Sequence, residues 1–163
     1  AHCVGSTLIA PLHRTRLDAY RDVMRVNLDS AVFMLQAWIA ALEGKPGAAV
    51  FASSVVARIG VANHEAIAAA KGGIKLLTQA MTAEWAQYGI QANAIGPGYI
   101  RTEMTQPLAD DPAFDAWMRA RTPARRWGTP ADLIGVAVFL ASPASDYVNG
   151  QIIYVDGGML AVL

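Results

Sequence analysis

The sequence has only one cysteine and no long hydrophobic run. Cys3 stands alone among 163 residues, which excludes an internal disulfide framework and a cysteine-rich metal site. The apolar runs fall short of the roughly 20 residues that a membrane-spanning helix needs. These absences favour a cytoplasmic protein with no metal centre and no membrane span, because disulfides are rare in reducing compartments.

An excess of charge of either sign is also missing. The 13 Lys and Arg residues balance the 13 Asp and Glu residues, so no electrostatic partner such as nucleic acid or an acidic membrane is indicated. With 54% hydrophobic residues, the chain has the length and composition of one domain with a sizeable core.

Strand-like and helix-like segments alternate along the chain. Short, continuous apolar segments at 48–52, 91–95 and 151–155 are typical of strands buried on both faces. Longer segments at 17–42 and 64–88 carry apolar residues at helical spacing. This alternation predicts the α/β class, with a Rossmann-like, doubly wound parallel sheet between two layers of helices.

Start signals indicate where several helices begin. Thr15 and Asp18 have the spacing of a capping box ahead of the first long helix. Asp111, followed by proline, indicates a second start. Thr129, also followed by proline, indicates a third helix that runs to Leu140.

The sheet predicted in this way is incomplete. Three strands and a strand end at Ala1–Val4 are fewer than an open doubly wound sheet normally has. The glycine-rich phosphate loop of its first βαβ unit, G-x-G-x-x-G, does not occur. We therefore expect residues 1–163 to be the C-terminal part of a single dinucleotide-binding domain, with an unpaired strand edge where earlier units would dock.

Five polar or glycine-rich features follow one another in a familiar order. Asn27 lies within the first long helix, Ser54 just after the first strand, and Lys71 in the second long helix. Pro97–Thr102 follows the second strand, and Asp156–Gly158 ends the third. In this order and spacing the whole chain resembles the short-chain dehydrogenase/reductase family.

The resemblance makes Ile67 the unusual residue. In that family an active-site tyrosine lies thirteen residues after the serine and four before the lysine, and both spacings lead from Ser54 and Lys71 to position 67. The phenol exchanges a proton with the substrate oxygen, helped by the neighbouring ammonium. Ile67 has no proton to give, and losing a general acid typically costs about 10² to 10⁴ in rate.

The resemblance also implies three catalytic side chains. Ser54 would hydrogen-bond the substrate oxygen, Asn27 would hold a water in a proton relay, and Lys71 would hold the ribose hydroxyls of the nicotinamide. Taken alone, Ser54 is equally typical of a strand end, and Lys71 of a solvated helix surface. Their shared register favours the functional interpretation.

The same resemblance implies that the cofactor is NAD or NADP. Pro97, Gly98, Ile100 and Thr102 would form the nicotinamide-binding turn, with backbone groups near Ile100 and the Thr102 hydroxyl meeting the carboxamide or a phosphate. A plain proline–glycine turn is the structural alternative.

His64 is one helical turn before Ile67 and is the candidate to replace the missing proton donor, because imidazole exchanges protons near neutral pH. Glu65 is close to it in the sequence. The alternative is that both residues only begin the helix, where an acidic side chain is favoured.

The segment from Thr105 to Arg126 falls where the family has its substrate lid. Arg119, Arg121, Arg125 and Arg126 are candidates to bind a substrate carboxylate. Surface or subunit contacts are the alternative for all four.

The adjacent Gly72 and Gly73 weaken the second long helix, which predicts the close approach of another backbone. In the family that helix usually packs against its copy, which implies a homo-oligomer, a dimer or a homotetramer.

Stretches after Gly96 resemble the gluconate 5-dehydrogenase branch of the family, whereas His2–Gly5 departs from the usual Asn-Asn-Ala-Gly. The resemblance implies an NAD(P)-dependent oxidoreductase that interconverts a secondary alcohol and a ketone, with a sugar acid or polyol as its small-molecule substrate. The alternative is a non-catalytic relative that binds a ligand or assembles into an oligomer.

Overall fold

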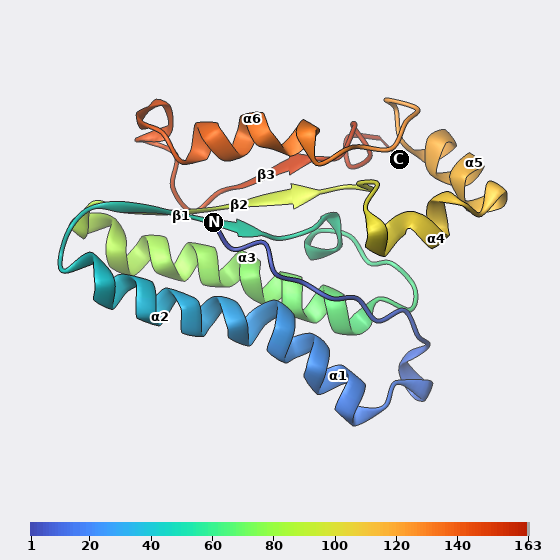
Figure 1. Ribbon diagram of the computed structural model, residues 1–163, viewed down its shortest axis with the longest axis horizontal. Helices are drawn as coiled ribbons and strands as arrows, with labels where there is room; N and C mark the ends of the chain where they lie inside the picture. Colours follow the sequence, from blue (N-terminus) through green and yellow to red (C-terminus); the bar gives the residue numbers. More distant parts are fainter. Residues whose placement is uncertain (163) are drawn as a thin grey trace.

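The computed structural model describes residues 1–162 as a parallel three-stranded sheet with helices on both faces (Figure 1). The strands are β1 (Gly47–Ala52), β2 (Ile90–Pro97) and β3 (Ile152–Val155), and they lie side by side in that order. All three coincide with the apolar segments that predicted them. The expected α/β class and the partial Rossmann-like sheet are thus confirmed.

Helices cover both faces of this sheet, and further helices lie beyond the carboxyl ends of the strands (Figure 1). Within residues 1–162, no helix combines the length and the apolar character needed to cross a bilayer. The helices are α1 (Leu17–Met24), α2 (Ser30–Leu42), α3 (Glu65–Trp85), α4 (Gln106–Ala109), α5 (Pro112–Arg121) and α6 (Ala131–Leu140).

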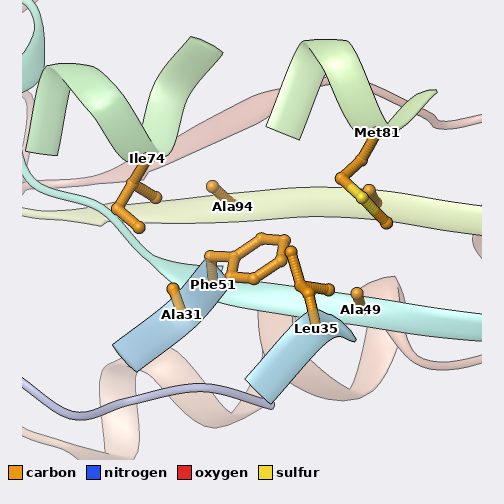
Figure 2. Close-up of a cluster of buried hydrophobic side chains, with 8 residues drawn as sticks. Ala31, Leu35, Ala49, Phe51, Ile74, Met81 and Ala94 are labelled. Carbon is orange, nitrogen blue, oxygen red and sulfur yellow. The ribbon is translucent and has the colours of Figure 1, made fainter. Parts of the chain in front are cut away.

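The two faces of the sheet have separate cores, because side chains alternate along each strand. On one face Phe51 of β1 packs among α2 and α3, with Leu35 and Ile74 beside it (Figure 2). On the other face Val50 and Ile95 pack against α6. Burial on both faces accounts for the continuous apolar runs of the strands.

The outer edge of β1 is covered at one point by the start of the chain. The His2 backbone bonds to β1 on both sides of Phe51, with His2 N–H donating to Val50 O and Ala52 N–H donating to His2 O. The strand end expected at residues 1–4 is thus a single parallel bridge. The rest of this edge presents unpaired backbone groups, as expected for a partial sheet.

Helices begin at Leu17, Pro112 and Ala131, at or next to the three predicted starts, but the capping box predicted ahead of the first helix is wrong. Thr15 donates to Pro11 O, and Asp18 is held by Arg16, so no capping box forms. Asp111 caps α5 by accepting from two backbone N–H groups. At α6, Asp132 accepts from the backbone N–H and the hydroxyl of Thr129.

Candidate functional site

A cleft of about 430 Å³ opens at the carboxyl ends of the strands. Six parts of the chain line it: the loop after the first bridge, the first helical segment, the segment after β1, the start of α3, the turn after β2 with α4, and Met159 after β3. Most of its lining is apolar. The polar and titratable side chains that line it are Ser6, Thr7, Asn27, Ser53, Ser54, His64, Lys71, Tyr99 and Thr105.

Ser54 is placed in the cleft by the end of β1. The strand stops at Ala52, and Ser54 has an extended backbone ahead of a short 3-10 turn, Val55–Ala57. Its hydroxyl oxygen accepts from Val56 N–H at 3.3 Å. The hydroxyl proton therefore remains available to a ligand oxygen, as the predicted role requires.

Asn27 lies at the one irregular turn of the first helix. Residues Arg25–Asp29 form a π-helical turn between α1 and α2, a feature frequent at functional sites. The Asn27 amide is buried, donates to Val23 O at 2.9 Å and Ser6 O at 3.0 Å, and accepts from Ser6 N–H at 3.3 Å. It thus ties the loop at Ser6 to the helix beneath the cleft.

Lys71 reaches the cleft from α3 with its ammonium held inside the protein. The residue is buried, and Nζ donates to Ala52 O at 2.8 Å. Burial lowers the pKa of the Lys71 ammonium from 10.5 to about 8. The bond to Ala52 O is the only hydrogen bond from the Lys71 ammonium within residues 1–162, so two of its three N–H donors remain for hydroxyl groups of a ligand. The alternative of a solvated surface charge is therefore wrong.

Ile67 also lines the cleft, one turn before Lys71 on α3. It is buried and packs with Val23, Ala66 and the partly buried Tyr20. The side chain in the position between Ser54 and Lys71 is therefore apolar and fixed by packing. His64 lines the cleft one turn earlier, and its Nδ1 lies 2.7 Å from Ala62 O.

The residues of the predicted nicotinamide turn do not all line the cleft. Gly98 lines the cleft, and a Cβ there would lie 2.8 Å from Asp156 Cα, so the backbone just after β3 leaves room only for glycine. Ile100 instead lines a neighbouring cavity of about 230 Å³ and bridges to Gly128. Pro97 ends β2 beside Val155. Thr102 is exposed and forms a capping box with Thr105.

The predicted carboxylate site at four arginines is not formed in the cleft. Arg119 pairs with Asp115 at 2.7 Å, and Arg126 pairs with Asp132 at 2.8 Å. Arg121 donates to Val162 O, and Arg125 to backbone carbonyls of α5. All four sit outside the cleft lining, so the surface-contact alternative is supported.

The sequence analysis missed Tyr99 and Ser6. Tyr99 stands between the cleft and the neighbouring cavity, packed edge-on against Phe114, Trp117 and Trp127, and burial raises the pKa of its phenol. Ser6 joins the site through Asn27. Neither residue has a local signal, because contacts between distant segments bring both to the cleft.

The close approach predicted at the two glycines of α3 is found at one of them, with a different cause. A Cβ on Gly73 would lie 2.9 Å from Leu28 Cδ2, so a side chain of the π turn packs there rather than another backbone. A Cβ on Gly72 would meet nothing within 4 Å.

The fold and the position of the cleft define a Rossmann-like α/β protein, the class that binds ligands at the carboxyl ends of its strands. A family model described as "Enoyl-(Acyl carrier protein) reductase" matches residues 1–160. The chain belongs to the short-chain dehydrogenase/reductase family.

Several relatives are similar over most of this chain. The 5-keto-D-gluconate 5-reductase of Escherichia coli strain K12 is 46% identical over 146 residues, which cover 88% of this chain and 57% of that protein. The 2-dehydro-3-deoxy-D-gluconate 5-dehydrogenase of Formosa agariphila is 43% identical over 155 residues, which cover 94% of this chain and 59% of that protein. This chain thus spans less than two thirds of the length of either relative.

One solved structure has the same fold over nearly the whole of this chain. The gluconate 5-dehydrogenase from Burkholderia cenocepacia J2315, in complex with NADP and tartrate, superposes with a TM-score of 0.94 at 43% identity. The match covers 98% of this chain and 63% of that one.

Proposed function

We propose that this chain carries the catalytic cleft of an NAD(P)-dependent oxidoreductase that interconverts a secondary alcohol and a ketone. The observation that carries the proposal is the meeting of Ser54, Ile67 and Lys71 in one cleft at the carboxyl ends of the strands. Three side chains from two separate elements meet there in the register of the family's serine, tyrosine and lysine.

The donor groups of the cleft fit the nicotinamide end of NAD or NADP. Lys71 has two N–H donors for the ribose hydroxyls, and Gly98 keeps the turn after β2 close to the cleft. We assign the carboxamide to the same turn, from Pro97 through Ile100 to Thr102, on the family pattern. When bound, the nicotinamide supplies or accepts the hydride.

The chain's own residues position the substrate oxygen and the protons. Ser54 donates its hydroxyl proton to the ketone oxygen or accepts from the alcohol. Asn27, anchored to Ser6, holds a water that connects the cleft to bulk solvent. Lys71 fixes the ribose.

Sugar acids are the substrate class that the relatives support. Two of them are named for oxidation or reduction at a gluconate derivative, and the structure from Burkholderia holds tartrate, a hydroxy acid. We therefore propose a gluconate-like sugar acid or a polyol as the substrate.

We also propose that residues 1–163 form one C-terminal part of the dinucleotide-binding domain, and that the protein is a cytoplasmic homotetramer. Exposed apolar side chains on the outer face of α2, including Val32 and Phe33, and Leu76 on α3 support subunit contacts. Gly72 supports close helix packing, because the space beside it is open. The single cysteine supports a reducing compartment.

Turnover of the full-length protein on a panel of sugar acids and polyols with NAD and NADP tests the proposed reaction. Ile67→Tyr should raise turnover at least tenfold, because it returns a phenol to the position between Ser54 and Lys71. If cofactor binds but both proteins are inert on every substrate, the chain is a ligand-binding or oligomeric relative instead.

A further inference from the structure

His64 is the N-cap residue of α3, and it lines the cleft together with two residues of that helix. His64, Ile67 and Lys71 are spaced i, i+3 and i+7, which stacks their side chains along one side of a helix. All three line the cleft. An imidazole therefore stands one turn above the position where the family pattern expects a phenol.

The hydrogen bond to Ala62 determines which nitrogen of His64 carries the proton in the neutral ring. A backbone carbonyl only accepts, so His64 Nδ1, 2.7 Å from Ala62 O, must be the donor. In the neutral ring Nε2 then holds the free lone pair. The same bond orients the ring, as second partners of acid–base histidines do.

The other titratable side chains of the cleft are poorly placed for proton exchange with a substrate. Lys71 is committed to Ala52 O and, in the proposed function, to the ribose. Tyr99 is packed within an aromatic cluster and holds its proton strongly, since burial disfavours the phenolate. His64 alone combines a cleft position, an orienting bond and a free nitrogen.

We propose that His64 is the acid–base residue of this cleft, in place of the phenol absent at Ile67. This inference rests on the proposed oxidoreductase function. In the reducing direction, the hydride from the reduced nicotinamide adds to the carbonyl carbon, and a proton passes from Nε2 of protonated His64 to the oxygen. The products are the alcohol, the oxidised nicotinamide and neutral His64, which regains its proton from solvent.

His64→Asn in the full-length protein tests the inference, because the Asn side chain retains an N–H donor for Ala62 O. We expect kcat for ketone reduction to fall at least 100-fold, while the NADPH dissociation constant from fluorescence titration changes less than threefold. His13→Asn is the matched control, since His13 is exposed on a 3-10 turn outside the cleft lining. It should leave both values unchanged.

The pH dependence of the rate provides a second readout. Protonated His64 is the acid, so kcat for reduction should fall as pH rises, and kcat for oxidation should rise. Lys71 and Tyr99 line the same cleft and Glu65 follows on α3, so Tyr99→Phe and Glu65→Gln are run beside it. The pH dependence of kcat should persist in both variants and disappear in His64→Asn.

NMR of the histidine rings supplies a readout that does not depend on turnover. Long-range ¹H–¹⁵N spectra of the three histidines, assigned with His64→Asn and His13→Asn, should show the neutral His64 ring protonated at Nδ1. Gluconate added to the NADP complex should shift the ring resonances of His64 and leave those of His13 unchanged.

The outcomes separate the inference from the proposed function. If the wild type turns over and His64→Asn keeps more than a third of that rate, or if the ring is protonated at Nε2, His64 is not the acid–base residue and the oxidoreductase proposal stands. If the wild type binds NADPH but is inert while Ile67→Tyr is active, His64 fails as a donor. If neither NADPH nor NADH binds, the proposed function itself is wrong.

Discussion

The Lys71 ammonium is held in the interior by a single recorded hydrogen bond. The proposed role of Lys71 as a cofactor contact requires the positive charge of the ammonium, whereas burial disfavours that charge. A fall in pKa from 10.5 to about 8 corresponds to about 3 kcal/mol of unfavourable free energy for the charged form. Functional residues often lower stability in this way.

Lys71→Met should therefore stabilise the fold at pH 7. We expect a gain of about 2 kcal/mol in the free energy of unfolding, after subtracting about 1 kcal/mol for the lost hydrogen bond to Ala52 O. Urea denaturation followed by circular dichroism measures it. A loss of stability would mean that the ammonium has more partners than Ala52.

The pH dependence of this gain follows from the sign of the pKa change. Between pH 8 and 10.5 the unfolded chain keeps the proton that folded Lys71 loses, so the wild type becomes more stable relative to Lys71→Met as pH rises. The gain should be complete below pH 8 and should shrink towards pH 10.5. A gain independent of pH would contradict the burial of this charge.

The sequence positions of the site residues were predictable, whereas their contacts were less so. The family resemblance aligned Ser54, Ile67 and Lys71, because each follows a strand or lies on a helix at the spacing of the family pattern. The burial of Lys71 and its bond to Ala52 come from the packing of α3 on β1, which no local pattern reveals. Arg119 and Arg126 misled because their partners, Asp115 and Asp132, look like ordinary surface acids. Arg121 and Arg125 misled because their partners are backbone carbonyls.

At the scale of elements, α5 depends on Asp111, the N-cap residue just before it. Asp111 accepts from Ala113 N–H at 2.9 Å and Phe114 N–H at 3.4 Å, two of the groups that a helix start leaves without partners. This helix supplies Phe114 and Trp117 to the aromatic cluster around Tyr99. The cap therefore supports one wall of the cleft.

Asp111→Ala should lower the free energy of unfolding by about 1 kcal/mol, because both N–H groups lose their acceptor. Asp110→Ala is the matched control, since Asp110 is exposed and contacts only the side chains of Gln106 and Arg101. Thermal unfolding of the two variants measures the difference. Equal midpoints would show that the cap contributes nothing.

Elements buried on both faces were predicted well, and irregular ones were not. The apolar runs of β1, β2 and β3 permit no other arrangement in a chain of this pattern. The π turn at Asn27 went unpredicted, and Asn27 bonds there to Ser6, a residue 21 positions away in the sequence. Asp18 misled as a cap because Arg16 competes for its carboxylate.

At the scale of the whole molecule, the outer face of α3 points to assembly. Gly72 lies within α3, and a Cβ there would meet nothing within 4 Å in residues 1–162. Gly72→Leu should keep the circular dichroism spectrum and convert the oligomer into smaller species, as measured by light scattering after size-exclusion chromatography.

Gly60→Leu is the control for this prediction, because a Cβ at Gly60 also meets nothing and the residue lies in a loop away from α3. It should leave the oligomer intact. An unchanged mass for Gly72→Leu would place the subunit contacts elsewhere.

Binding of NADPH to the full-length wild type and to Lys71→Met tests the central claim most directly. Fluorescence titration should give saturable binding to the wild type, weakened at least tenfold in Lys71→Met, because the ribose loses its ammonium partner. The absence of wild-type binding of either NADPH or NADH at millimolar concentration, or equal affinity in both proteins, would contradict the cleft as a nicotinamide site.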